Sequence, residues 1–334
     1  MTYRLFWLLL CLLLAGCESL FIPPDRGSDP LSVFDEVWTF ADEEYSFFAY
    51  KNIDWDEVRS RYEPQVRVDM SQEALFDVLA EMLFELRDGH VNLSASFDRS
   101  RNWQWYLESP PNYDFDLLER SYFCGEEQYF GPFIIYDFGD VGYVHYRSFT
   151  STVSASTMTR LIEKFGGHRG LILDVRNNGG GSLSNARRMA RFFTRDTLAY
   201  GRSRIRNGPA REDFTAWEDE RIEPQADDTV FLKPIILLTN RSSYSATNTF
   251  TAMMWALPQV TVLGDTTGGG GGAPADTDLA NGWLLRVSAT QVESPAGFNV
   301  ENGIPPDTLV YLDSAQATSG FDSMLEAALA QLRQ

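Results

Sequence analysis

The second half of the chain alternates between two kinds of apolar pattern, and this alternation restricts the fold more than any other feature. Four short apolar runs rich in β-branched residues predict buried strands at 133–136, 141–146, 171–175 and 234–238. Helical patterns lie between and after them, at about 155–165, 183–195, 245–256 and 320–333. Strands that are apolar on both faces and alternate with helices are typical of a sheet covered on each side. The sequence therefore predicts an α/β domain over 133–334.

The segment before this domain has a helical pattern from Leu31 to about residue 88. Its clearest part is 71–86, where apolar residues recur at the spacing of an amphipathic helix. Ser71 stands at the N-cap position, and Gly89 is predicted to be the left-handed residue that ends the helix. We assign 31–97 to an N-terminal helical subdomain. The irregular, aromatic-rich stretch 98–132 is predicted to be a connecting segment.

The first residues have the pattern of an export signal. A single positive charge at Arg4 precedes an apolar run, Leu5–Leu14, which is far shorter than the ~20 residues that a membrane-spanning helix needs. Leu14-Ala15-Gly16-Cys17 then resembles the bacterial lipobox, in which the cysteine is acylated and becomes the new N-terminus. This predicts a signal peptide over 1–16, lipidation at Cys17 and a proline-containing tether over 17–30. The alternative is an ordinary signal peptide that is cut near Ala15–Gly16.

Composition restricts the partners and the chemistry. Asp and Glu number 47 against 28 Lys and Arg, a formal charge of −19, so nucleic acid is not an expected partner. An acylated Cys17 would leave Cys124 as the one other cysteine after cleavage, so no intramolecular disulfide is expected. Groups able to act as a base are few, because the chain has three lysines and three histidines: Lys51, Lys164, Lys233, His90, His145 and His168.

Three segments carry candidate chemistry: 88–90, just past the N-terminal helix, and 174–181 and 239–248, each directly after a buried strand. The glycines at 179–181 could bring convergent N–H groups to a phosphate or an oxyanion, although a bare triple glycine is more often a tight turn without chemistry. The pattern G-x-G-x-x-G of dinucleotide sites does not occur there.

Ser245 opens a predicted helix after a buried strand, a position that suits either an N-cap or a nucleophile. Ser242 and Ser243 lie nearby, so position alone does not choose among the three serines. A serine nucleophile needs a base, and the sequence has no lysine or histidine after Ser245. His90 follows a helix end and an acidic residue, which leaves it free to face a cleft, although a histidine satisfied within its loop would look the same. Lys51, Lys164 and Lys233 are the lysine alternatives.

Together these segments resemble the tail-specific (carboxyl-terminal-processing) serine peptidases. Leu-Arg-Asp-Gly-His at 86–90, the strand and glycines of 171–181, and Ser-Tyr-Ser-Ala at 243–246 stand in that family's order. Gly-Asp-Thr-Thr-Gly-Gly at 264–269 and Val-Glu-Asn-Gly-Ile-Pro-Pro-Asp at 300–307 extend the match, and Asn52-Ile53-Asp54-Trp55 is also family-like. The resemblance implies a ClpP/crotonase-like catalytic domain. Only about 35 residues separate it from the helices, so no PDZ domain is expected.

The resemblance also implies the site. The glycine region 264–272 has no lysine, so the Ser/Lys dyad of many relatives is absent. The branch similar to the tricorn core protease and to retinoid-binding-protein repeats takes its histidine from Asp-Gly-His. Carried over, Ser245 is the nucleophile, His90 the general base and Glu301 the orienting acid. Backbone N–H groups of Gly180 or Gly181 and of Ala246 would form the oxyanion hole. At 247–248, Thr and Asn replace the acid of many relatives.

The resulting expectation is an exported, lipid-anchored serine endopeptidase that acts on polypeptide through an acyl-enzyme, without metal or cofactor. We expect it in the cell envelope, on the outer membrane because no aspartate follows Cys17. A non-catalytic protein that binds a hydrophobic ligand or peptide on the same scaffold is the alternative. Acyl transfer on a cofactor thioester fits an exported chain less well. No oligomeric state is predicted.

Overall fold

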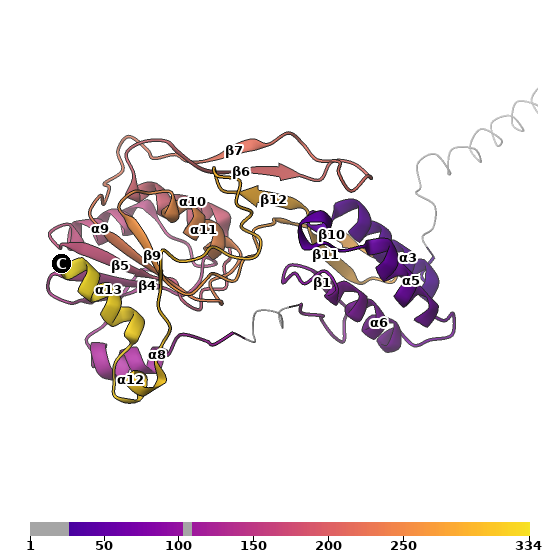
Figure 1. Cartoon of the computed structure of the whole chain (residues 1–334), viewed down its shortest axis with the longest axis horizontal. Coiled ribbons are helices and arrows are strands. Elements are labelled where there is room, and N and C mark those ends of the chain that lie inside the picture. Colours follow the sequence, from indigo (N-terminus) through magenta and orange to yellow (C-terminus); the bar gives the residue numbers. More distant parts are fainter. Residues whose placement is uncertain (1–26, 103–108) are drawn as a thin grey trace, which may run out of the picture.

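A computed structural model describes residues 27–102 and 109–334, which form two bodies lying side by side (Figure 1). One body holds the N-terminal helices, and the other holds the largest sheet. The predicted signal peptide, Cys17 and most of the tether lie outside the described residues, as does 103–108 of the connecting segment. Within the described ranges, no helix has both the length and the apolar character to cross a bilayer.

The larger body is built on a mixed, seven-stranded sheet. Its strands pair in parallel from one edge to β4 and antiparallel from there to the other edge. The four predicted strands all lie in it, which confirms the α/β prediction. In spatial order the strands are β13 (Thr308–Leu309), β9 (Val260–Gly264), β8 (Ile235–Thr239), β5 (Gly170–Asp174), β4 (Val141–Tyr146), β3 (Phe133–Asp137) and β2 (Gln128–Phe130).

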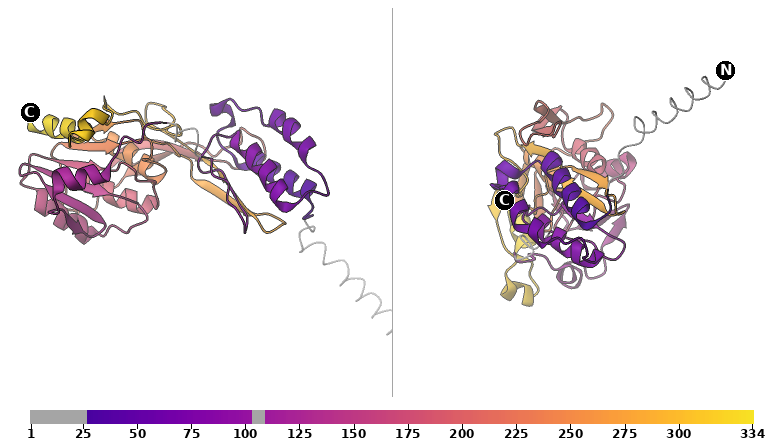
Figure 2. Two further views of the ribbon diagram at one scale, coloured as in Figure 1. Left: turned by 90° about the horizontal axis from the view of Figure 1, so that it is seen from below. Right: turned by 90° about the vertical axis from the view of Figure 1, so that its right-hand side faces the viewer.

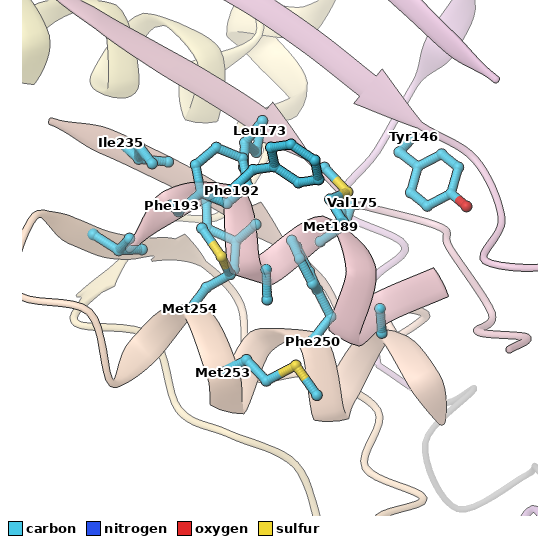
Figure 3. Packing of buried hydrophobic residues seen from close by; sticks show 14 of the residues in the cluster. Tyr146, Leu173, Val175, Met189, Phe192, Phe193, Ile235, Phe250, Met253 and Met254 are labelled. Atoms are coloured by element: carbon cyan, nitrogen blue, oxygen red, sulfur yellow. The ribbon is translucent and has the colours of Figure 1, made fainter. Parts of the chain in front are cut away.

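Helices cover both faces of this sheet, because its central strands are apolar on both sides. One core joins the sheet to α9 (Ala155–Phe165), α10 (Leu183–Ala190) and α11 (Ala246–Trp255), and Figure 3 shows side chains of α10 and α11 packed together. The other core contains α13 (Ser323–Arg333) and α8 (Phe115–Leu118). The helix predicted over 183–195 ends earlier, in the 3-10 turn η3 (Arg191–Phe193).

A separate antiparallel sheet extends from the larger body towards the smaller one (Figure 1). It consists of β12 (Thr290–Glu293), β6 (Leu198–Ile205) and β7 (Glu218–Ile222), in that order. The connecting segment holds α8, a π-helical turn η2 (Glu119–Phe123) and β2, and α12 (Ser314–Thr318) lies near it. These short elements account for 109–132 without a PDZ module.

The smaller body contains the predicted N-terminal helices, but a segment from late in the chain completes it. Its elements are α3 (Pro30–Glu44), α4 (Phe48–Lys51), α5 (Trp55–Tyr62), η1 (Glu63–Gln65), α6 (Gln72–Phe84) and β1 (Asn92–Ser94). The hairpin of β10 (Pro274–Asp278) and β11 (Leu284–Ser288) pairs with β1 and contributes apolar side chains to the same core. Both views of Figure 2 show this hairpin against the N-terminal helices. This hairpin was predicted to belong to the domain 133–334, but it is part of the N-terminal body.

The ends of α6 test two predictions. Ser71 caps the helix as predicted, because its hydroxyl accepts a 3.3 Å hydrogen bond from the N–H of Ala74. The prediction for Gly89 is wrong: the residue with left-handed backbone is Arg87, at φ 47°. Asp88 explains the difference, since its carboxylate accepts a 2.8 Å hydrogen bond from the N–H of His90 and closes the turn without a glycine cap.

Candidate active site

Ser245 lies in the tight turn between β8 and α11. Its backbone has φ 58° and ψ −121°, which is a strained conformation for any residue other than glycine. The turn is held by two bonds to a neighbouring glycine segment: Ser245 N–H donates to Gly269 O at 2.9 Å, and Gly268 N–H donates to Ser243 O at 2.8 Å. A serine on a strained strand-to-helix turn has its hydroxyl presented at the top of the sheet, as in a nucleophile elbow.

His90 reaches this serine from the other body. It lies two residues before β1, and its Nε2 is 2.9 Å from Ser245 Oγ. The Tyr244 ring packs at 5.0 Å from the imidazole. Burial lowers the pKa of His90 below its ordinary value, although the charge of Asp88 opposes the shift. The ring is therefore neutral near pH 7, the state in which it can accept the proton of the serine hydroxyl.

The predicted oxyanion donors lie directly against the turn. A side chain on Gly180 would approach Tyr244 O, Ser245 Cβ and Ala246 N at 2.7, 2.8 and 2.9 Å, so this glycine is required for the close approach. Its own N–H donates to Asn178 Oδ1 at 3.0 Å. Among the described residues no hydrogen bond engages the N–H of Gly181 or of Ala246. The geometry thus favours Gly181 and Ala246 as the pair available to an oxyanion.

Glu301 is buried close to the histidine, without a hydrogen bond to it in the described part of the chain. Its Oε1 accepts from Lys51 Nζ at 2.9 Å, and its Oε2 accepts from the N–H of Gly271 at 3.0 Å. His90 Nδ1 is buried and faces the backbone of Gly272, the next residue. Burial, followed by the charge of nearby Asp88, raises the pKa of Glu301 to about 7. Two consecutive glycines therefore contact the two side chains: Gly271 binds the predicted orienting acid, and Gly272 faces the histidine.

Sequence reasoning missed the roles of Lys51 and Asp88. Lys51 Nζ lies 3.6 Å from Asp88 Oδ2 as well as contacting Glu301. Burial acts to raise the pKa of Asp88, but the charges of Lys51 and His90 outweigh it and hold that pKa below its ordinary value. Lys51 entered the sequence analysis only as a possible base. Its position directly before the family-like Asn52-Ile53-Asp54-Trp55 is the signal that could have identified it.

The other histidines are engaged elsewhere. His145 Nε2 is 2.9 Å from the hydroxyl of Tyr113, and its Nδ1 is 3.1 Å from Asp174 O. His168 Nε2 lies 2.8 Å from a carboxylate oxygen of Asp137. Their surroundings give each a structural role within the larger body.

Asn248, one of the two residues predicted to replace the acid of many relatives, connects α11 to the segment before Glu301. Its amide donates to Val300 O at 2.9 Å, and its Oδ1 accepts from Thr267 Oγ1 at 2.6 Å. This buried network fixes the backbone that carries Glu301 relative to the helix that Ser245 opens.

Comparison with known proteins identifies the family of this chain. Residues 140–310, just over half of the chain, match the model of peptidase family S41. The chain belongs to this family. Residues 28–84 match a second model, the tricorn protease C1 domain, so the S41 match and this one account for both bodies.

One solved structure and two curated proteins are similar to this chain. A candidate peptidase from Parabacteroides merdae ATCC 43184, known from a crystal structure, is 40% identical, with a TM-score of 0.88 over 92% of this chain and 98% of that one. The carboxyl-terminal-processing protease of Synechocystis sp. is 27% identical over 57% of this chain and 43% of its own length. The C-terminal processing peptidase of Tetradesmus obliquus is 26% identical over 50% and 34%. The chain thus spans less than half of these curated relatives.

A further solved structure has low sequence identity to this chain, so the similarity shows only a shared fold. Mature CPAF is 12% identical, with a TM-score of 0.69 over 91% of this chain and 97% of that one. Its agreement over nearly the whole of both chains places the two-body arrangement within the S41 fold.

Proposed function

We propose that this chain is a serine endopeptidase that cleaves peptide bonds in polypeptide substrates through an acyl-enzyme on Ser245. The observation that carries the proposal is the 2.9 Å separation between His90 Nε2 and Ser245 Oγ, on a serine whose backbone is strained. A serine hydroxyl within hydrogen-bond reach of a neutral imidazole is an arrangement that activates the serine as a nucleophile. Membership of family S41 supports peptide as the substrate class.

In the proposed mechanism, His90 Nε2 takes the proton of Ser245 as Oγ attacks the scissile carbonyl carbon. The oxyanion that forms is bound by the N–H groups of Gly181 and Ala246, which are free to receive it. His90 then gives its proton to the leaving amine, and water hydrolyses the acyl-enzyme by the same route. Glu301, with Asp88 beside it, supplies the negative charge that stabilises the imidazolium.

We further propose that the chain is exported, lipidated at Cys17 and held in the cell envelope, on the outer membrane. The support is the sequence of residues 1–17: one positive charge, a short apolar run and Leu-Ala-Gly-Cys. In this arrangement the acidic catalytic bodies would work at a membrane surface, at a reach set by the tether.

The proposed activity is tested with a serine-directed phosphonate probe. We expect the probe to label the mature protein at Ser245 and to spare Ser245→Ala. His90→Ala should lose peptide hydrolysis by a factor on the order of 10⁴–10⁶, as for loss of a triad member. His145→Ala is the matched control, because that histidine is engaged by Tyr113 and Asp174. A folded wild-type protein that resists the probe would favour the alternative, a non-catalytic binding protein.

A further inference from the structure

A buried lysine side chain contacts the proposed acid and the turn that carries the proposed base. Lys51, the last residue of α4, has a side chain that is only 4% exposed. Its Nζ is 2.9 Å from Glu301 Oε1 and 3.6 Å from Asp88 Oδ2, and the side chains of Asp88 and Glu301 are 0% and 1% exposed. Two carboxylates so close together in a buried site cannot both be ionised unless a positive charge compensates them. Lys51 supplies that charge.

Lys51 also fixes the turn that carries His90. Nζ donates to the carbonyls of Leu86 at 3.3 Å and Arg87 at 3.0 Å, which directly precede the Asp88-Gly89-His90 sequence. Arg87 returns the contact, since its Nη2 donates to Lys51 O at 2.6 Å. An ammonium group has three protons, and here they are shared among the two carbonyls and Glu301. One side chain thus ties the His90 turn of the smaller body to the acid of the larger one.

Lys51 is not placed to be the base. Its Nζ makes no contact with Ser245 in the described residues, whereas His90 Nε2 makes one at 2.9 Å. An ammonium group with its protons bound to oxygen atoms also has no lone pair to accept another. Any effect of Lys51 on the reaction must pass through the groups that it holds.

We propose that Lys51 is a positioning residue for the hydrolysis: it fixes the His90 turn against the larger body and balances the negative charges of Asp88 and Glu301. The inference rests on the proposed function, because it assumes that Ser245 and His90 carry out the reaction.

The charge role predicts a pH dependence. The groups facing Glu301 are Lys51 and Asp88, together with the hydroxyls of Tyr45 and Tyr50, whose pKa values are raised by burial and then in part by Glu301. The pKa of Glu301 is about 7, and its ionised form is the one that can stabilise an imidazolium. Activity should therefore rise as pH increases through about 7. Removal of the Lys51 charge favours the protonated acid, so this rise moves to higher pH.

The experiment compares kcat/KM for an unfolded, fluorogenic protein substrate between about pH 5 and pH 10 in the wild type and in Lys51→Gln. We expect the acidic limb to move up by about one unit or more, which is about a tenfold loss near neutral pH that alkaline pH relieves. A smaller loss that does not depend on pH should remain, because the His90 turn is no longer held. Lys51→Arg keeps the charge and should restore most of the shift. Lys164→Gln, at an exposed lysine, is the matched control and should leave the profile unchanged.

Two outcomes overturn the inference. One is a Lys51→Gln profile that coincides with the wild type, and the other is an equal loss at every pH, which a merely structural role would produce. If Lys51→Gln does not fold, Lys51→Arg is compared with the wild type instead. Because it keeps the positive charge, its acidic limb should stay near pH 7, and a limb that moves although the charge is kept overturns the inference. Failure of the probe on the wild type and on Lys164→Gln would instead refute the proposed function.

Discussion

Gly180 is the position where a single methyl group tests the proposed site most directly. A Cβ there would approach Tyr244 O, Ser245 Cβ and Ala246 N at 2.7–2.9 Å, and two of these three atoms belong to the backbone. No rotamer change can relieve such contacts. The glycine also has φ 98°, which an L-residue rarely adopts. Gly180→Ala must therefore displace the turn that carries Ser245.

The magnitude follows from two costs. Backbone strain of this kind is worth about 1–3 kcal/mol, and overpacking by a methyl group costs about 1–3 kcal/mol. We expect Gly180→Ala to lower the free energy of unfolding by about 2–6 kcal/mol. Displacement of Ala246 N–H from an oxyanion should reduce kcat by about 10²–10³. Gly179→Ala is the matched control, because a Cβ there meets nothing within 4 Å, and its effect should stay within about 0.5 kcal/mol.

The assay measures denaturant unfolding and the rate of phosphonate labelling for both alanine variants. Labelling must be compared under conditions in which each variant is folded, so that loss of the site is separated from loss of the fold. If Gly180→Ala matches Gly179→Ala in both stability and labelling rate, the packing of this glycine against the turn has been misjudged.

Two further predictions concern the core and the anchor. Arg176 is fully buried, and its guanidinium lies 2.6 Å from Asp174 and 2.8 Å from Asp322. Arg176→Met leaves both buried carboxylates uncompensated, so it should lower the free energy of unfolding by about 3–5 kcal/mol. Arg187→Gln, which breaks a half-exposed pair, should cost at most about 1 kcal/mol. Urea unfolding of both variants measures the two losses, and equal losses would contradict the argument. Cys17→Ser should abolish incorporation of labelled palmitate in the bacterial cell. Undiminished labelling of that variant would exclude Cys17 as the acylated residue.

The sheet could be predicted because its central strands are continuous apolar runs, whereas in the helices between them the apolar residues recur at helical spacing. Leu171–Val175 shows the limit, since the strand observed is Gly170–Asp174, a shift of one residue. The pairing of His90 with Ser245 was implied by the family resemblance, although the two residues are 155 positions apart and carry no local signal of contact. The strained φ of Ser245 is a product of tertiary packing and could not be predicted from the sequence.

The features that escaped prediction depend on contacts between distant segments. The β10–β11 hairpin alternates exposed and half-buried residues in β10, so nothing in it indicates which body it covers. Lys51 and Glu301 are 250 residues apart, and each looks like an ordinary charged residue in its own segment. At Gly89 the usual rule for a helix end failed, because the Asp88 side chain supplied the turn's hydrogen bond instead.

The contribution of β10 and β11 to the smaller body sets an order of events during folding. The core around α3 and α6 contains Leu279, Trp283, Leu285 and Val287, so these helices cannot complete their core until this late segment has joined them. Contacts of such long sequence separation form late, because a large loop must be closed first. His90 adjoins β1, which pairs with β11. The proposed base can therefore meet the proposed nucleophile only after the β10–β11 hairpin has joined the smaller body, which is a late step in folding.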